Sequence, residues 1–438
     1  MDKEQLKAHV RDVIRRNFVQ TKKIGDSIFS EPELGFKEVK TSAKVRAAFD
    51  ELGIPHEDGL AITGVKGRLP GGKPGRTVAL LGELDAIVCR NHPASDPVTG
   101  AAHCCGHNVQ IANVLAVARA LKESGAMEHL AGEVVFFAVP AEEYVEIDYR
   151  SKLLEEGKLK FLGGKPNLIA QGAFDDIDIS LMMHVNATTA PDGDFTVGAS
   201  SNGFVGKLIE YRGRAAHAAG APDQGINALN AAMMGVMGVN ALRETFRESD
   251  VVRFHPIINS GGDLVNVIPD YVKMESYTRA SNVEALARYN RSINRALRAG
   301  AMALGAECSI TDFPGYLPLK PDESFRDILR ANAKEVFGAE RVVDGDHSAG
   351  STDMGDVSHL MPVVHPWVGC VRGTLHGSDY QVFDEDIAFV KSPEVLAMTI
   401  IDLLWDDGAE AERMCREFKP VFTKETYVKF IEDLTADN

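Results

Sequence analysis

The chain has 438 residues, 45% of them hydrophobic and 25% charged, which is a globular composition long enough for two or three domains. Its net charge of −16 and its lack of Lys/Arg blocks exclude the usual classes of proteins that bind nucleic acid or anionic membranes. No apolar run is long enough to span a membrane, no export signal is visible and the six cysteines are too sparse for a disulfide framework, so we expect a cytoplasmic protein.

The first part of the chain alternates helical and strand patterns, as α/β domains do. Its strands are nearly continuous apolar runs, which predicts a sheet covered by helices on both faces. The predicted elements are helices over about 3–28 and 38–52 and strands over 77–86, 133–143 and 178–185.

Polar residues follow each of these predicted strands. Glu83 and Asp85 close the first strand, Glu142 and Glu143 follow the second, and His184 lies near the end of the third. Because ligands of such sheets bind at the carboxyl ends of the strands, these residues indicate a functional site.

From about residue 200 the pattern changes to that of an α+β domain. The order strand–helix–strand–strand–helix–strand predicts a ferredoxin-like insert. Its expected elements lie at 203–218, 227–246, 251–280 and 283–304. After about 314 the α/β character returns, with a strand at 362–369 and a final helix near 390–405. We therefore expect a discontinuous catalytic domain with a mixed, mainly parallel sheet, residues 1–199 and 314–438, interrupted by a lid domain, residues 200–313.

The densest group of reactive side chains is the run His103-Cys104-Cys105-Gly106-His107. Cys105 and His107 flank a glycine turn before a helix, so both can point at one divalent ion, because thiolate and imidazole bind Zn²⁺, Mn²⁺, Co²⁺ or Fe²⁺. Buried cysteines with a capping histidine would give the same pattern without a function. A nucleophilic Cys105 with His107 as its base is the competing enzymatic interpretation.

Glu142 and Glu143 leave a predicted buried strand together. In metal sites one such carboxylate can bind the ion while its neighbour moves the proton of the attacking water. A solvated pair of loop acids is the alternative. His184, His376 and His217 are each weak candidates alone, since most isolated histidines are structural, but together they supply ligands from separate segments.

With these residues in view, the chain resembles the M20 metallopeptidase family, in particular its aminoacylase and amidohydrolase branch. Nine segments in the family's order carry the resemblance: SEPELGFKEVKTS (30–42), GELDA (82–86), HCCGHN (103–108), PAEE (140–143), MHV (183–185), GRAAHA (213–218), NVIPD (266–270), STDMGDVS (351–358) and LHGSD (375–379).

The resemblance implies a divalent metal centre with one or two ions, either Mn²⁺ or Zn²⁺. The ligands that it implies are Cys105, His107, Glu143, His184 and His376. It also implies that Glu142 is the general base and later the proton donor, and that Asp85 orients a ligand imidazole.

The lid domain has its own implied roles. In the family a histidine at the position of His217 completes the active site of a neighbouring subunit and steadies the oxyanion, which implies a homodimer or higher homo-oligomer. Asn266 and Arg279 are weaker candidates for binding a substrate carboxylate.

Two features depart from the family pattern. Asn108 and Gln110 stand where an Asp and a His are usual, and both are weak candidates for contact with substrate. The segment 144–172 replaces a Gly-rich stretch, and we expect its Glu146, Asp148 and Arg150 near the mouth of the site. This variant is similar to a bacterial subgroup that replaces an aromatic amine with hydroxyl.

We therefore expect a metal-dependent hydrolase that uses an activated water to break a C–N bond of a small carboxylate-bearing substrate. The first specific reaction is the conversion of 5-nitroanthranilate into 5-nitrosalicylate and ammonia. Hydrolysis of N-acyl amino acids or aminobenzoyl-glutamate is the second, and dipeptidase or carboxypeptidase activity the third. A binding protein that kept the fold and lost catalysis is the alternative from another class.

Overall fold

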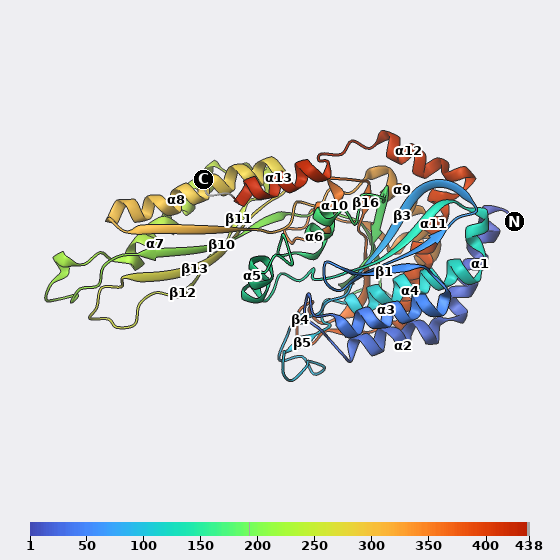
Figure 1. Ribbon diagram of the computed structural model, residues 1–438, viewed down its shortest axis with the longest axis horizontal. Coiled ribbons are helices and arrows are strands. Elements are labelled where there is room, and N and C mark those ends of the chain that lie inside the picture. Colours follow the sequence, from blue (N-terminus) through green and yellow to red (C-terminus); the bar gives the residue numbers. More distant parts are fainter. Residues whose placement is uncertain (192, 436–438) are drawn as a thin grey trace. The chain divides into compact units, whose positions relative to one another are not determined.

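The computed structural model describes residues 1–191 and 193–435, which divide into two compact units (Figure 1). Unit 1 comprises Met1–Ser200, Lys320–Asp346 and Asp356–Lys424. Unit 2 comprises Ser201–Leu319, His347–Gly355 and the stretch from Glu425 onward. This division differs from the expected boundaries, because the later part of the chain returns twice to unit 2.

Unit 1 is built on a six-stranded sheet in which four neighbouring strands are parallel. The strands, in spatial order, are β1 (His56–Leu60), β2 (Gly64–Pro70), β6 (Ala131–Val139), β3 (Lys73–Glu83), β7 (Ile179–Met182) and β16 (Val363–Val364). In the ladders Glu83 lies beside Val139 and Leu81 beside Met182. The carboxyl ends of β3, β6 and β7 therefore meet at one edge of the sheet.

A second sheet of unit 1 carries the chain onward from β7. Its strands are β15 (Val342–Asp344), β9 (Phe195–Val197), β17 (Trp367–Arg372), β18 (Gln381–Val382) and β8 (His184–Ala187), which pairs with β17. A short hairpin is formed by β4 (Ile87–Val88) and β5 (Ala101–Ala102). Since β7 ends at Met182 and β8 begins at His184, this histidine lies where the chain passes from the first sheet to the second.

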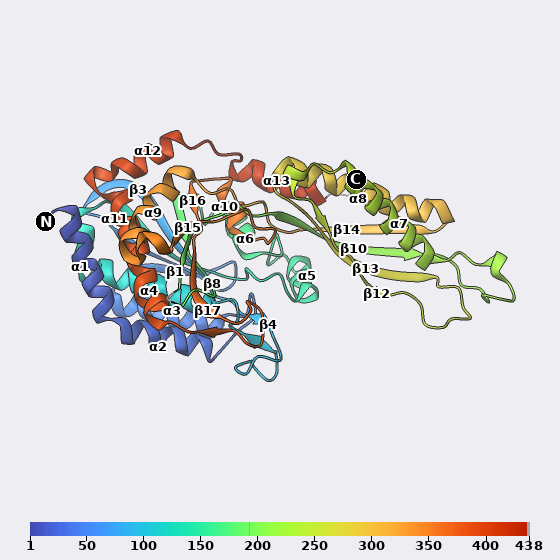
Figure 2. The ribbon, with the colours of Figure 1, turned by 180° about the vertical axis from the view of Figure 1, so that it is seen from behind.

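Helices surround the sheets of unit 1 (Figure 2). They are α1 (Lys3–Arg16), α2 (Phe18–Phe29), α3 (Val39–Leu52), α4 (His107–Glu123), α5 (Ile147–Glu155), α6 (Gly164–Gln171), α9 (Glu323–Phe337), α11 (Ser392–Leu404) and α12 (Ala409–Glu417). The short helix α10 (Met354–Ser358) lies where the chain passes from unit 2 to unit 1. Helix α4 packs against β3, β6, α1, α2 and α11, and all its residues from His107 to Leu121 are buried. It is therefore a rigid support for whatever its first residue binds.

Unit 2 has an antiparallel sheet with two long helices packed on it. The sheet order is β11 (Arg253–Phe254), β13 (Tyr271–Ala280), β10 (Gly203–Arg212) and β14 (Glu307–Pro314), with β12 (Ile257–Ser260) also paired to β13. The helices are α7 (Ala228–Leu242) and α8 (Val283–Leu304), and α13 (Lys424–Thr435) ends the described chain. A Cβ on Gly300 of α8 would lie 2.3 Å from the amide nitrogen of Gly235 of α7, so glycine allows these helices to touch.

The α/β fold with its α+β insert confirms the predicted fold class, but some element boundaries were wrong. The helix expected over 3–28 is two helices, because Asn17 adopts a non-helical conformation and its side chain donates to the carbonyl of Val13. The helix near 390–405 is not the final one, since α12 and α13 follow it. Within the described residues no helix is long and apolar enough to cross a membrane, and the six cysteines are unpaired.

Candidate metal centre

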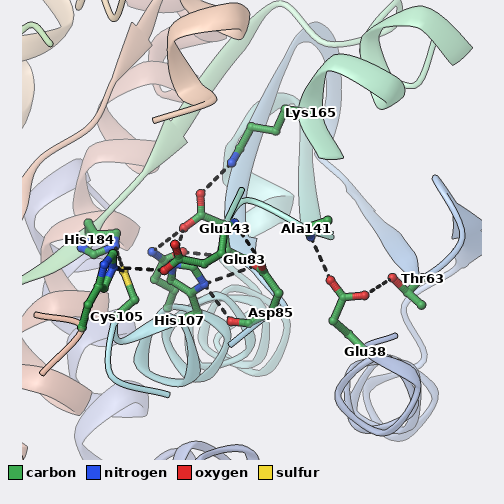
Figure 3. A network of polar contacts seen from close by, with 12 residues as sticks. Glu38, Thr63, Glu83, Asp85, Cys105, His107, Ala141, Glu143, Lys165 and His184 are labelled. Atoms are coloured by element: carbon green, nitrogen blue, oxygen red, sulfur yellow. Dashed lines mark hydrogen bonds and ion pairs between the residues drawn. The ribbon is translucent and has the colours of Figure 1, made fainter. Parts of the chain in front are cut away.

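The five predicted ligands come together in unit 1. Figure 3 shows four of them: Cys105, His107, Glu143 and His184. They form two groups that share one thiol: Cys105, His107 and His184 in the first, and Cys105, Glu143 and His376 in the second. In each group the three ligand atoms lie within 4.8 Å of one another. Residues up to 271 positions apart in the sequence thus converge on Cys105.

A glycine turn places Cys105 and His107 on the same side. Gly106 has φ +95°, a left-handed conformation, and a Cβ there would lie 2.1 Å from Cγ2 of Val185. Only glycine fits this position without strain or displacement of Val185. The turn also begins α4, so the imidazole of His107 is fixed at the start of a helix that is buried from His107 to Leu121.

The turn that carries the two glutamates is held from three directions. Ala141 has φ +55°, and its amide donates to a carboxylate oxygen of Glu38 over 2.8 Å. The amide of Glu143 donates to Oδ2 of Asp85 over 2.9 Å. The buried guanidinium of Arg150 donates to the carbonyl oxygens of Glu143 and, over 2.7 Å, of Leu162. These contacts stabilise an unfavourable backbone conformation at the site.

Cys105 is the centre of the ligand group. Its Sγ lies 3.3 Å from Nε2 of His184 and 3.2 Å from Nε2 of His376. The same nitrogen of His376 is 3.2 Å from Oε1 of Glu143. Cys105, Glu143 and His184 are buried, whereas the side chain of His376 is 47% exposed. The centre is therefore open to solvent on the side of His376.

Asp85 lies behind His107, as expected of a residue that orients a ligand imidazole. Nδ1 of His107 is 2.8 Å from the carbonyl oxygen of Asp85 and 3.4 Å from its carboxylate. A proton on Nδ1 therefore leaves Nε2 as the lone-pair nitrogen that faces the group. Asp85 thereby positions both residues: its carbonyl contacts the His107 imidazole, and its carboxylate accepts from the amide of Glu143.

Without an ion, the buried side chains of this site have strongly shifted pKa values. Burial, and then the charge of Glu143, raise the pKa of the Cys105 thiol well above its usual value. Burial opposes a charge on His107, but Cys105 and Glu83 outweigh it and raise its pKa. Burial lowers the pKa of His184 to about 4. Without an ion, these buried groups are stabilised by protons that they share. A divalent cation would take the place of those protons.

The donor set fits a divalent transition-metal ion. Nε2 of His107 and Oε1 of Glu143 are buried and form no well-directed hydrogen bond within the described parts of the chain. Thiolate, imidazole and carboxylate are the ligands of Zn²⁺ and related ions, and ligands at about 2.0–2.3 Å from one ion lie roughly 3–4 Å apart. The ligand atoms need only small movements to hold such an ion.

Two residues of the centre were missing from the predicted site. Glu83 was noticed at the end of β3 but not assigned, and its Oε2 lies 3.1 Å from Nε2 of His107. Lys165, fully buried in α6, places its ammonium 2.7 Å from the other oxygen of Glu83. Sequence reasoning had a signal for Glu83 in its strand end, but Lys165 follows two glycines in a segment without periodicity.

Asn108 and Gln110 have structural partners. The amide of Asn108 donates to the carbonyl of Gly25 in α2 over 3.3 Å, which ties α4 to α2. The amide of Gln110 exchanges two hydrogen bonds with Glu83, one to its backbone at 3.0 Å and one to its carboxylate at 2.9 Å. Gln110 therefore acts on the metal centre by holding Glu83.

The segment 144–172 is also placed differently from the expectation. Arg150 is not at an open mouth: it is buried under the rings of Phe36 and Tyr144. Glu146 pairs with Lys37 at 2.8 Å, and Asp148 begins α5 on the exposed side. Of these three charged residues, Arg150 alone supports the turn of the two glutamates.

The remaining candidates lie in unit 2. His217 is exposed, and its Nδ1 accepts from the amide of Gly220 over 3.0 Å. The carbonyl of Asn266 accepts from the amide of Ala218 over 2.9 Å. Arg279 donates to Ser351 over 2.7 Å and lies against the rings of Phe204 and Tyr277. Their roles toward substrate stay predictions.

Comparisons with known proteins show the family and the fold of the chain. A model of Peptidase family M20/M25/M40 matches residues 79–400. A Xaa-Arg dipeptidase from Mus musculus is 31% identical over 362 residues, which are 78% of this chain and 73% of that protein. Among solved structures, a dinuclear metal-binding peptidase of family M20 from Bacillus subtilis has a TM-score of 0.66 and 22% identity, over 89% of this chain and 99% of that one.

An aminobenzoyl-glutamate utilization protein from Klebsiella pneumoniae also has a TM-score of 0.66, at 20% identity, over 91% of this chain and 100% of that one. At these identities the solved structures establish the fold alone, whereas the family match and the first relative span most of the chain.

Proposed function

We propose, since this chain belongs to peptidase family M20/M25/M40 and is thus a metal-dependent hydrolase of carbon–nitrogen bonds, that it hydrolyses an amide bond of a small carboxylate-bearing substrate. The main support for this proposal is that the turn of Glu142 and Glu143 lies beside the proposed ligands around Cys105. Water activation requires ligands that hold a metal ion and a nearby carboxylate that takes the proton of the water.

The ligands in this proposal are the five that converge on Cys105. When bound, a divalent ion such as Mn²⁺ or Zn²⁺ would act as a Lewis acid that makes a water molecule more acidic. The two groups share only Cys105, so together they would hold one ion or two. The Bacillus subtilis relative is described as dinuclear, which supports the second arrangement.

Glu142 is the proposed general base. Its carboxylate lies within 4.8 Å of ligand atoms of Glu83 and His107, and it is less buried than Glu143. It would take the proton of the attacking water and return it to the leaving nitrogen. Glu143 cannot do this while it serves as a ligand, so the two neighbouring acids divide the two tasks.

The relatives favour an amide as the scissile bond. A dipeptide and aminobenzoyl-glutamate, named in two of the relatives, both contain an amide next to a free carboxylate. Hydrolysis of 5-nitroanthranilate at its aromatic amine is the second candidate, from the variant Asn108, Gln110 and 144–172 pattern. The burial of Arg150 weakens the argument for a charged entrance, so we place the amide reaction first.

Two further parts of the proposal concern unit 2. His217 would steady the developing oxyanion as a partner in catalysis, and the chain would act as a homodimer or a higher homo-oligomer. Both rest on the family resemblance of the GRAAHA segment at 213–218.

A substrate panel tests the proposal. The protein, loaded with Mn²⁺ or Zn²⁺, is given Xaa-Arg dipeptides, N-acyl amino acids, aminobenzoyl-glutamate and substituted anthranilates, and the released amine or ammonia is measured. Turnover of an amide member supports the proposed function. Ammonia release from 5-nitroanthranilate alone would replace it with the second candidate, and no turnover by a metal-loaded protein would contradict both.

A further inference from the structure

The buried ion pair of Lys165 and Glu83 lies directly beside the proposed metal ligands. Both side chains are inaccessible to solvent, and their charged atoms are 2.7 Å apart. The other oxygen of Glu83 accepts from Gln110. It also lies 3.1 Å from Nε2 of His107, which is drawn with Glu83 and Lys165 in Figure 3. Two buried charges are costly to desolvate, so such a pair needs a reason beyond stability.

His107 belongs to two overlapping sets of ligands. On one side it shares a group with Cys105 and His184, and on the other with Glu83 and Glu142. A single Nε2 can bind one ion, so an ion on His107 must take one set or the other. The first set contains a thiolate, which favours Zn²⁺, and the second contains two carboxylates, which favour Mn²⁺ and other hard ions.

We propose that Lys165 decides between these sets: by neutralising Glu83, it directs the ion to the Cys105 side of His107. Its ammonium supplies the positive charge that Glu83 would otherwise draw from a metal ion, and it repels a divalent cation placed beside that carboxylate. Lys165 is thus a positioning residue that acts on the metal through Glu83. The inference rests on the proposed metal centre.

The geometry of α6 makes this role specific to residue 165. Gly164 precedes it, and a Cβ on Gly164 would lie 1.6 Å from the carbonyl oxygen of Pro140, so the helix starts in contact with the turn of the two glutamates. The amide of Gly164 also donates to Ala141 over 3.2 Å. The ammonium is therefore delivered by the same segment that supports Glu142 and Glu143.

The test compares metal binding in the wild-type protein, Lys165→Met, the double variant Glu83→Gln/Lys165→Met and a control, Lys158→Met, whose lysine side chain is 60% exposed. Each protein is stripped of metal and loaded with Co²⁺, and the thiolate-to-cobalt charge-transfer absorption reports whether Cys105 is a ligand. Competition with a chelator gives the affinities for Zn²⁺ and Mn²⁺. Thermal unfolding shows whether each variant is folded.

We expect the thiolate absorption in the wild-type protein and in Lys158→Met. In Lys165→Met the absorption weakens and the preference for Zn²⁺ over Mn²⁺ falls by roughly 10–100-fold, the size of other effects from residues behind metal ligands. The double variant regains the absorption. Because it removes both buried charges, it leaves no unpaired charge and can still be measured if Lys165→Met does not fold.

An unchanged absorption and ion preference in Lys165→Met would overturn the role of Lys165 alone. A folded double variant that fails to regain the absorption would also overturn it, because the effect would not pass through Glu83. A wild-type protein that takes up no Co²⁺ would contradict the proposed metal centre and this inference together.

Discussion

Adjacent residues at the centre have different environments, and this difference sets their expected chemistry. Glu143 is buried; burial opposes its charge, but His376 and His107 outweigh burial and lower its pKa. Glu142, one residue earlier, is half-buried. A carboxylate that stays ionised among imidazoles is a ligand, whereas one nearer to solvent can exchange protons with water.

Replacement of these neighbours separates the two roles. Glu142→Gln should keep its metal and lose turnover by roughly 10²–10⁴-fold, because only the proton transfer is removed. Glu143→Gln should lose metal affinity as well. Metal content and turnover of both variants are the measurements. Near-normal turnover of Glu142→Gln would show that another group is the base.

Glu38 offers a residue-scale prediction for stability. Burial, and then the charge of Asp85, raise the pKa of this carboxyl to about 7. The folded protein therefore holds its proton more tightly than the unfolded chain, whose carboxyl titrates near 4.5. The stabilising contribution is complete below about pH 4.5 and is lost as the pH rises to about 7.

Glu38→Gln has no proton to lose, so its free energy of unfolding should vary less across this pH window. Urea unfolding at several pH values measures the slope, with Glu57→Gln, an exposed carboxyl on β1, as the control. Equal slopes in Glu38→Gln and the wild-type protein would refute the assignment.

At the scale of elements, the start of α4 fixes the metal ligands. Gly106 combines a left-handed conformation with contact to Val185, whereas Gly125, just after the same helix, is left-handed with open space around it. Gly106→Ala should therefore lower both stability and metal affinity, while Gly125→Ala carries backbone strain alone, of order 1 kcal/mol. Unfolding and metal titration check this, and equal losses in both variants would contradict it.

The elements show what local sequence could and could not predict. Continuous apolar runs correctly placed β3, β6 and β7, and glutamates or histidine at their ends marked the edge of the sheet where the centre lies. The helix break at Asn17 was missed, because one polar residue inside an amphipathic pattern looks like an exposed position. Its side-chain bond to the carbonyl of Val13, four residues earlier, is a local contact to which hydrophobic periodicity is blind.

The segment 144–172 exposes a more general limit. A run of charged residues is usually solvated, so Arg150 was expected near the open mouth of the site. The structure instead satisfies its guanidinium with backbone carbonyls of a turn that is itself irregular. Periodicity cannot reveal a buried cation whose partners are main-chain atoms. Lys165 was missed for a different reason, because its carboxylate partner Glu83 is 82 positions away in the sequence.

For the whole molecule, the order of the motifs along the chain predicted more about the site than any single helix or strand did. Cys105 and His376 are 271 positions apart, and their proximity can be predicted only by reference to a known fold. The resemblance therefore singled out five residues as proposed ligands, a choice that pattern alone left open, and the structure places them close together. It did not predict Glu83 or Lys165. Glu83 lies in the GELDA segment, where the resemblance gives a role to Asp85 alone, and Lys165 lies in the variant segment 144–172.

The central claim is that hydrolysis depends on a divalent ion held around Cys105. The most direct measurement is turnover of an amide from the substrate panel before chelation, after removal of metal and after addition of Mn²⁺ or Zn²⁺, with metal content determined at each step. The account predicts that activity disappears with the ion and returns with it. Activity that survives complete removal of metal would contradict the account.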